Sequence, residues 1–161
     1  MSLVVCPGSF DPLTMGHVDV IRRARDIFGE VIVGVAENSA KNYMFSLTER
    51  VELARVALAD LSDVEVVAVP GLLADFAKES GAVAIVKGVR GEADFISEKV
   101  MALANQNLSS VETVFMLSDP KYAHVASSIV KDIAKHGGDV RGTVPANVAQ
   151  ALENYWKGEQ A

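Results

Sequence analysis

The chain has 161 residues, 50% of them hydrophobic and 22% charged, so it is large and apolar enough to bury the core of one globular domain. Its formal net charge of −6 argues against a broad basic face for nucleic acid, and no apolar run approaches the length of a membrane span. The single cysteine, Cys6, excludes an internal disulfide, and together with an N-terminus unlike a signal peptide it predicts a soluble cytoplasmic protein with a small-molecule task.

Five short apolar runs alternate along the chain with segments of helical periodicity. Their apolar residues are consecutive instead of alternating, which is typical of strands buried on both faces of a parallel sheet. The runs that we predict as strands are residues 3–6, 31–36, 64–69, 83–86 and 113–117.

Six helices are predicted between and after these strands. In the first, His17, Ile21, Ala24 and Phe28 follow helical spacing and form one inward stripe. The second begins with a capping-box pattern at residues 46–49. The others are expected at about 72–78, at about 93–107, from 127 or 128 to the glycine pair at 137–138, and from about 145 to just before 158.

The repeated order of strand and helix predicts the fold class. We expect a single doubly wound α/β domain over residues 1–161, with a five-stranded parallel sheet covered by helices on both faces. Such sheets bind ligands beyond the carboxyl ends of their strands. Candidate site residues are therefore those that follow each strand directly.

The first strand is followed by residues 7–17, which read PGSFDPLTMGH. Gly8 permits close approach of a ligand to the backbone. Thr14 is a suitable N-cap, so His17 would lie in the first helical turn, where free amides and the helix dipole favour a phosphate. The alternative is a core histidine or a part of the helix cap. The position of His17 just beyond a strand end and a Gly-Ser turn favours phosphate binding.

Cations and hydroxyls follow other strands. Lys41 stands in a polar loop and, taken alone, is most simply a solvated residue. Lys87 and Arg90 flank a glycine in the segment KGVR, which is a stronger anion signal because the backbone can approach while both side chains converge. Ser127 and Ser128 begin a helix whose free amides form a second potential phosphate site, although serine caps are common without any ligand.

The first motif resembles the nucleotidyltransferase superfamily that carries a His-x-Gly-His or Thr-x-Gly-His signature, and within it the phosphopantetheine adenylyltransferase family. The similarity continues through Lys41, MF at 44–45, ER at 49–50, KGVR at 87–90, SSIVK at 127–131 and GGDV at 137–140. It therefore spans nearly the whole chain. The resemblance implies a Rossmann-like nucleotidyltransferase fold and transfer of the adenylyl group of ATP to 4′-phosphopantetheine, giving dephospho-coenzyme A and pyrophosphate in coenzyme A biosynthesis.

The resemblance also implies roles for individual residues. His17, Lys41 and Arg90 would be catalytic, and phosphopantetheine would bind to Ser9, Lys41, Leu73 and Lys87. ATP would bind to Ser9, Phe10, His17, Gly88, Val89, Arg90, Glu98, Tyr122, Ala123, His124, Val125, Ala126, Ser127 and Ser128. Taken alone, Leu73 is most simply a core residue, and Glu98 is equally compatible with a solvated helix face.

One segment departs from the family pattern. The family carries an aromatic-Ser-Phe-x-Ser-Ser-Ser sequence where this chain reads YAHVASS at residues 122–128. Two hydroxyls are therefore missing, at Ala123 and Ala126, and His124 replaces an aromatic hydrocarbon. Contacts made by the backbone would survive these changes, whereas contacts that need the side-chain oxygens would not.

The sequence shows no covalent catalytic apparatus and no metal-ligand cluster, so Mg²⁺ is expected to arrive with ATP, held largely by phosphates and water. The resemblance further implies a homohexamer and feedback inhibition by coenzyme A. Two alternatives stay open. One is another adenylyl- or cytidylyltransferase of the superfamily, acting on nicotinate mononucleotide or a cytidine nucleotide. The other is a non-catalytic nucleotide-binding module.

Overall fold

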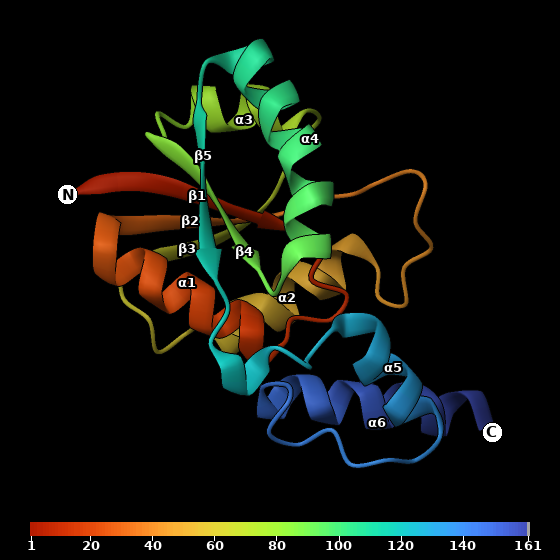
Figure 1. The fold of residues 1–161 in the computed structure, drawn as a ribbon. Coiled ribbons are helices and arrows are strands. Elements are labelled where there is room, and N and C mark those ends of the chain that lie inside the picture. The colour runs from red at the N-terminus through yellow and green to blue at the C-terminus, as the bar shows by residue number, and fades with distance from the viewer. Residues whose placement is uncertain (161) are drawn as a thin grey trace.

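Five parallel strands form one sheet in the computed structural model, which describes residues 1–160. The strands are β1 (Ser2–Gly8), β2 (Gly29–Val35), β3 (Val64–Ala68), β4 (Ala84–Val89) and β5 (Glu112–Leu117). Their spatial order is β3-β2-β1-β4-β5 (Figure 1). All five predicted strands are confirmed, and their bounds differ from the predicted ones by at most three residues.

The helices also follow the predicted order. They are α1 (Met15–Phe28), α2 (Leu47–Ala57), α3 (Leu73–Glu79), α4 (Glu92–Ser109), α5 (Ser127–Lys135) and α6 (Ala146–Gln160), with a short 3₁₀ turn, η1 (Pro120–Tyr122). The predicted end of the last helix before Gly158 is wrong. A glycine costs a helix about 1 kcal/mol but does not stop it, and an ion pair between Lys157 and Glu153 supports the last turn.

Helices cover both faces of the sheet, as predicted. Side chains alternate across β1, so that Val4 and Cys6 point to one face and Val5 to the other. The first face is covered by α1 and α2, whose buried residues include Ile21 and Ala54. The opposite face packs against α3 and α4 (Figure 1).

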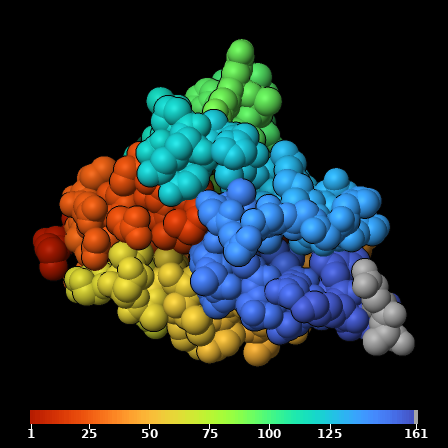
Figure 2. Space-filling model, turned by 90° about the horizontal axis from the view of Figure 1, so that it is seen from below, coloured from red at the N-terminus to blue at the C-terminus, as the bar shows by residue number. Residues whose placement is uncertain are grey.

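The last two helices do not cover a face of the sheet. They form a separate apolar cluster in which Val130 of α5 packs with Val148 and Leu152 of α6, together with Phe45 from the segment before α2. Figure 2 shows the blue atoms of the C-terminal segment that contains α6 beside the gold atoms of the segment that contains α2, and these two helices are in contact. The alternation of strand and helix in the sequence did not indicate this placement.

The sheet order defines where a ligand is expected. From β1 the chain crosses outward to β2 and β3, and it then returns to the other side of β1 to form β4 and β5. The connections therefore diverge between β1 and β4, which is the position where open α/β sheets bind ligands. Within residues 1–160, none of the helices is both long and apolar enough to cross a membrane.

Candidate active site

Two cavities lie at the carboxyl ends of β1 and β4. The first, of about 540 Å³, is bordered by the loop after β1, the start of α1, the end of β4 and the start of α5. The second, of about 500 Å³, is bordered by residues 36–41, the start of α3 and the inward side of α4. Residues that border both cavities are Pro7, Gly8, Ser9, Lys41, Lys87 and Glu98. The two cavities therefore meet where β1 and β4 end.

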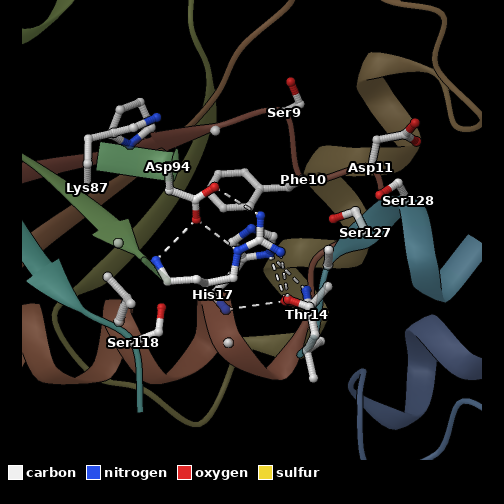
Figure 3. Close-up of a pocket in the computed structure, with 18 of the residues that line it drawn as sticks. Ser9, Phe10, Asp11, Thr14, His17, Lys87, Asp94, Ser118, Ser127 and Ser128 are labelled. Carbon is white, nitrogen blue, oxygen red and sulfur yellow. Dashed lines mark hydrogen bonds and ion pairs between the residues drawn. The ribbon is translucent and has the colours of Figure 1, made fainter. Parts of the chain in front are cut away.

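Thr14 and His17 cap the start of α1 reciprocally (Figure 3). The Thr14 Oγ1 accepts a hydrogen bond from the His17 N–H at 3.4 Å, and the His17 Nδ1 accepts one from the Thr14 N–H at 3.0 Å. A histidine thus fills the place that Glu or Gln takes in a capping box. Because Nδ1 is an acceptor, the proton of the neutral ring resides on Nε2. His17 is therefore part of the helix cap and also lines the first cavity.

The environment of His17 keeps its ring uncharged. Partial burial and the nearby charges of Lys87 and Arg90 lower the pKa of His17 to about 4. The ring of Phe10 meets the imidazole edge-to-face, with 5.1 Å between centroids. At neutral pH His17 can accordingly offer a fixed N–H donor to a phosphoryl oxygen, but not a positive charge.

The two cations at the end of β4 are oriented by carboxylates of α4. Lys87 Nζ lies 3.2 Å from a Glu98 oxygen, and Arg90 Nε lies 2.9 Å from Asp94. Arg90 also donates to the Val125 carbonyl at 3.3 Å, which connects β4 to the segment before α5. The hydrogen bonds from Arg90 hold the pKa of Asp94 below its usual value. Glu98 therefore faces the cavities and is not on a solvated helix face.

Lys41 and Leu73 border the second cavity. Lys41 is exposed in the loop between β2 and α2 and borders the first cavity as well. Leu73 is the first residue of α3 and lines the second cavity next to Leu72. The sequence assigned both residues to phosphopantetheine, and the structure places them in the same cavity.

The start of α5 borders the first cavity opposite Lys87 in the view of Figure 3. Its N-cap is Ala126, which has no side-chain oxygen to bind the free amides of the first turn. The hydroxyl of Ser127 donates to the Pro12 carbonyl at 2.9 Å and so fastens α5 to the first loop. Ser128, Tyr122 and Val125 also line this cavity. The first-turn amides are therefore available for a phosphate.

Three residues assigned to ATP, Val89, Ala123 and His124, do not line either cavity formed by the described residues. Val89 is buried, and strand alternation turns it away from the face on which Gly88 adjoins Val20 of α1. Ala123 and His124 follow η1 and are exposed. Their side chains therefore lie outside these two cavities, and the assignment of these three residues to ATP stays a prediction.

Sequence reasoning missed Asp11 as a site residue. Asp11 is only 5% exposed and accepts hydrogen bonds from the N–H groups of Met44 and Phe45 at 2.8 and 2.9 Å. It also pairs with Lys131 of α5 at 3.1 Å, so it joins three segments around the first cavity. Nothing local in the sequence separates such an acid from an ordinary loop aspartate.

Comparison with known proteins identifies the family. The cytidylyltransferase-like family model matches residues 5–133. The phosphopantetheine adenylyltransferase of Micrococcus luteus is 49% identical over 154 residues, which cover 95% of this chain and 98% of that protein. The chain belongs to the phosphopantetheine adenylyltransferase family. The resemblance predicted from the motifs is thereby confirmed.

Other similar proteins agree with this assignment. Phosphopantetheine adenylyltransferases of Bifidobacterium longum and Alkaliphilus metalliredigens are 49% and 47% identical, covering 94% of this chain in both cases and 93% and 98% of those proteins. A solved structure, the bifunctional NMN adenylyltransferase/ADP ribose pyrophosphatase from Francisella tularensis, matches 98% of this chain with a TM-score of 0.73. At 13% identity, and with this chain spanning 50% of that protein, the likeness shows the fold alone.

Proposed function

We propose that the protein transfers the adenylyl group of ATP to 4′-phosphopantetheine and so makes dephospho-coenzyme A and pyrophosphate. Membership of the family names the reaction. The observation that carries the assignment of residues is the meeting of two cavities at Ser9, Lys41 and Lys87. Two substrates that react through their phosphates need two binding sites with a shared cationic border.

The first cavity is suited to ATP and the second to phosphopantetheine. The amides at the start of α5 and the guanidinium of Arg90 would hold the phosphates that leave as pyrophosphate. Leu73 would contact the pantetheine arm, and Lys87 and Lys41 would bind its phosphate. One oxygen of that phosphate attacks the α-phosphorus of ATP. The new P–O bond forms as the bond to the bridging α–β oxygen breaks, and pyrophosphate leaves.

The rate enhancement would come from alignment and charge stabilisation. Nucleotidyl transfer needs two reactants held in line and donors aimed at the oxygens on which charge develops. The Nε2–H of His17, the ammonium of Lys41 and the guanidinium of Arg90 border the cavity where this occurs. The α4 carboxylates keep Lys87 and Arg90 oriented before the substrates bind. Phosphate oxygens can then replace those carboxylates as partners.

Magnesium would enter as part of the ATP complex. The three carboxylates at the first cavity, those of Asp11, Asp94 and Glu98, each pair with a lysine or arginine. Within residues 1–160, no group of three or more His, Cys, Asp or Glu side chains could hold a metal ion. This donor set does not fit a resident metal, so we assign the ion to phosphate and water ligands and derive no step through it.

We also propose that the chain forms a homohexamer. The outer side of α4 and the end of β5 expose large apolar side chains, which are typical of an interaction surface. They are Phe95, Ile96, Val100, Leu103, Leu108 and Leu117. Coenzyme A, proposed as a feedback inhibitor, contains both an adenosine part and a pantetheine part and would fill both cavities. We place the enzyme in the cytoplasm, in keeping with its buried free thiol, Cys6.

Pyrophosphate release from ATP with a panel of acceptors tests the reaction. Release that depends on 4′-phosphopantetheine, with dephospho-coenzyme A as the second product, is the expected result. Release only with nicotinate mononucleotide or a cytidine acceptor would assign the chain to a different activity of the superfamily. No release with any acceptor would instead indicate a non-catalytic nucleotide-binding module.

A further inference from the structure

Arg50 of α2 is the most deeply buried charged residue in the described chain, with 0% of its surface exposed. It lines neither of the two cavities formed by residues 1–160. Its Nη1 donates to the carbonyls of Ser9 and Ala36 at 2.8 and 3.0 Å, and its Nε donates to the Phe45 carbonyl at 3.2 Å. Three main-chain carbonyls from two loops therefore converge on one guanidinium.

Tyr43 adds a second layer to this arrangement. Its ring lies 4.0 Å from the guanidinium carbon of Arg50. Its hydroxyl accepts a hydrogen bond from the Asn38 N–H at 2.6 Å and lies 3.4 Å from the Ser9 hydroxyl. Arg50 and Tyr43 together connect the loop after β1, which carries Ser9, to the loop after β2, which carries Lys41.

Stability alone does not account for a charge in this position. Within residues 1–160, the carboxylate that pairs with Arg50 is that of Glu37 at 3.2 Å, and the Glu37 side chain is 58% exposed, so it neutralises the buried charge only in part. Replacing a buried ionic group by a hydrophobic side chain of similar volume is often neutral or stabilising. What a hydrophobic side chain cannot do is bind carbonyls that lie in different directions, whereas the planar fork of arginine does so with fixed geometry.

We propose that Arg50 is a positioning residue for adenylyl transfer. By holding the Ser9 carbonyl and the loop of residues 36–45 on one rigid group, it fixes the place of Lys41 at the border between the two cavities. Lys41 itself is held locally by a turn, in which its N–H donates to the Asn38 carbonyl at 2.9 Å, and residues 38–42 are exposed to solvent. This inference rests on the proposed function, in which Lys41 binds the reacting phosphates.

The test compares Arg50→Lys with Arg55→Lys, the same exchange five residues along α2. Arg55 is exposed, donates to Glu52 and the Val66 carbonyl, and borders neither cavity of the described chain.

For Arg50→Lys we expect kcat per folded molecule to fall on the order of 10- to 100-fold, because small misplacements of catalytic groups have such effects. The KM for ATP should change by less than about 3-fold, since the α5 amides and Arg90 do not contact Arg50. Arg55→Lys should leave kcat unchanged. A kcat within about 2-fold of wild type in Arg50→Lys would overturn the proposal.

A double-mutant cycle with Lys41→Ala identifies the route of the effect. If Arg50 acts through Lys41, Arg50→Lys should cost at least about 5-fold less in the Lys41→Ala background than in wild type. Equal losses in both backgrounds would contradict a positioning role. If Arg50→Lys does not fold, Arg50→Gln takes its place in the cycle, because its neutral amide can donate to only some of the three carbonyls. An unchanged kcat in that variant would also contradict the proposal.

Amide hydrogen exchange separates this inference from the proposed function, because it needs no substrate. Arg50→Lys, or Arg50→Gln in its place, should raise amide exchange in residues 36–45, and Arg55→Lys should not. If the wild-type protein shows no adenylyl transfer but the Arg50 variant still exchanges faster, the structural role of Arg50 stands and the proposed function is overturned. If the wild-type protein is active but exchange in the Arg50 variant is unchanged, only the role of Arg50 is overturned.

Discussion

His17→Ala should separate catalysis from stability at the candidate active site. In the wild type, the Nδ1 of His17 is bound to the Thr14 N–H, so the substitution removes the Nε2–H donor from the cavity. Loss of one preorganised donor typically lowers kcat by about 10²- to 10³-fold, or about 2.7–4 kcal/mol of transition-state stabilisation. The lost cap and the lost edge contact with Phe10 should together cost about 2 kcal/mol of folding free energy. A domain of ordinary stability survives that cost.

The matched control is His17→Gln. Glutamine at this position of a capping box can still accept from the Thr14 N–H, so the variant should regain most of the stability lost in His17→Ala. It lacks the imidazole ring and should remain impaired in turnover. Urea unfolding at pH 8 measures stability, and steady-state pyrophosphate release with saturating 4′-phosphopantetheine measures kcat and the KM for ATP. A kcat within about threefold of wild type for His17→Ala would refute the assigned role of His17.

Four further predictions follow from the geometry. In the same pyrophosphate-release assay, Lys87→Ala should raise mainly the KM for 4′-phosphopantetheine, by about tenfold or more. A rise confined to the KM for ATP would mean that each cavity holds the other substrate. The pKa of His17 falls from 6.5 to about 4 on folding, so the unfolded chain takes up the proton first as the pH is lowered. The free energy of unfolding should therefore drop by about 3 kcal/mol between pH 6.5 and 4. Urea titrations across this range would measure the drop, and His17→Gln should lack it. Gly88→Ala would place a Cβ 2.8 Å from Val20 Cγ2 and should destabilise the fold by about 1–3 kcal/mol, measured by thermal unfolding, with Val20→Ala restoring part of the loss. Leu103→Asp on the exposed side of α4 should reduce the mass measured by light scattering, and an unchanged mass would exclude this surface as the hexamer contact.

The order of elements and the location of the site were predictable because both follow from local signals. Consecutive apolar residues mark buried parallel strands, and Thr14 and Ser46 cap helices through contacts three residues away. The first motif begins in the last residues of β1, and the KGVR segment spans the end of β4. Parallel strands bring their carboxyl ends to one edge, so His17, Lys87 and Arg90 meet there.

The sequence was least informative where the outcome depends on packing. Gly158 carries a helix-ending signal, yet α6 continues past it to Gln160. The assignment of Val89, Ala123 and His124 to ATP stays a prediction: the alternation of β4 and the exposure of the segment after η1 place their side chains outside the two cavities described, so a contact there would come from the backbone. Both the end of a helix and the direction of a side chain depend on the folded backbone.

The sequence alone specified the class of fold and the family, because periodicity, caps and motifs act over a few residues, and it named the cations that we propose for phosphate binding. Only the tertiary structure decided which partners those groups take. The Arg50 guanidinium binds Ser9, 41 residues earlier, and Lys131 binds Asp11, 120 residues earlier. Such pairs depend on how distant segments close upon one another, and no short-range pattern encodes that closure. For the same reason, the net charge of −6 describes the protein as a whole, while the pairing of Lys87, Arg90 and Lys131 with carboxylates sets the local electrostatics of the site.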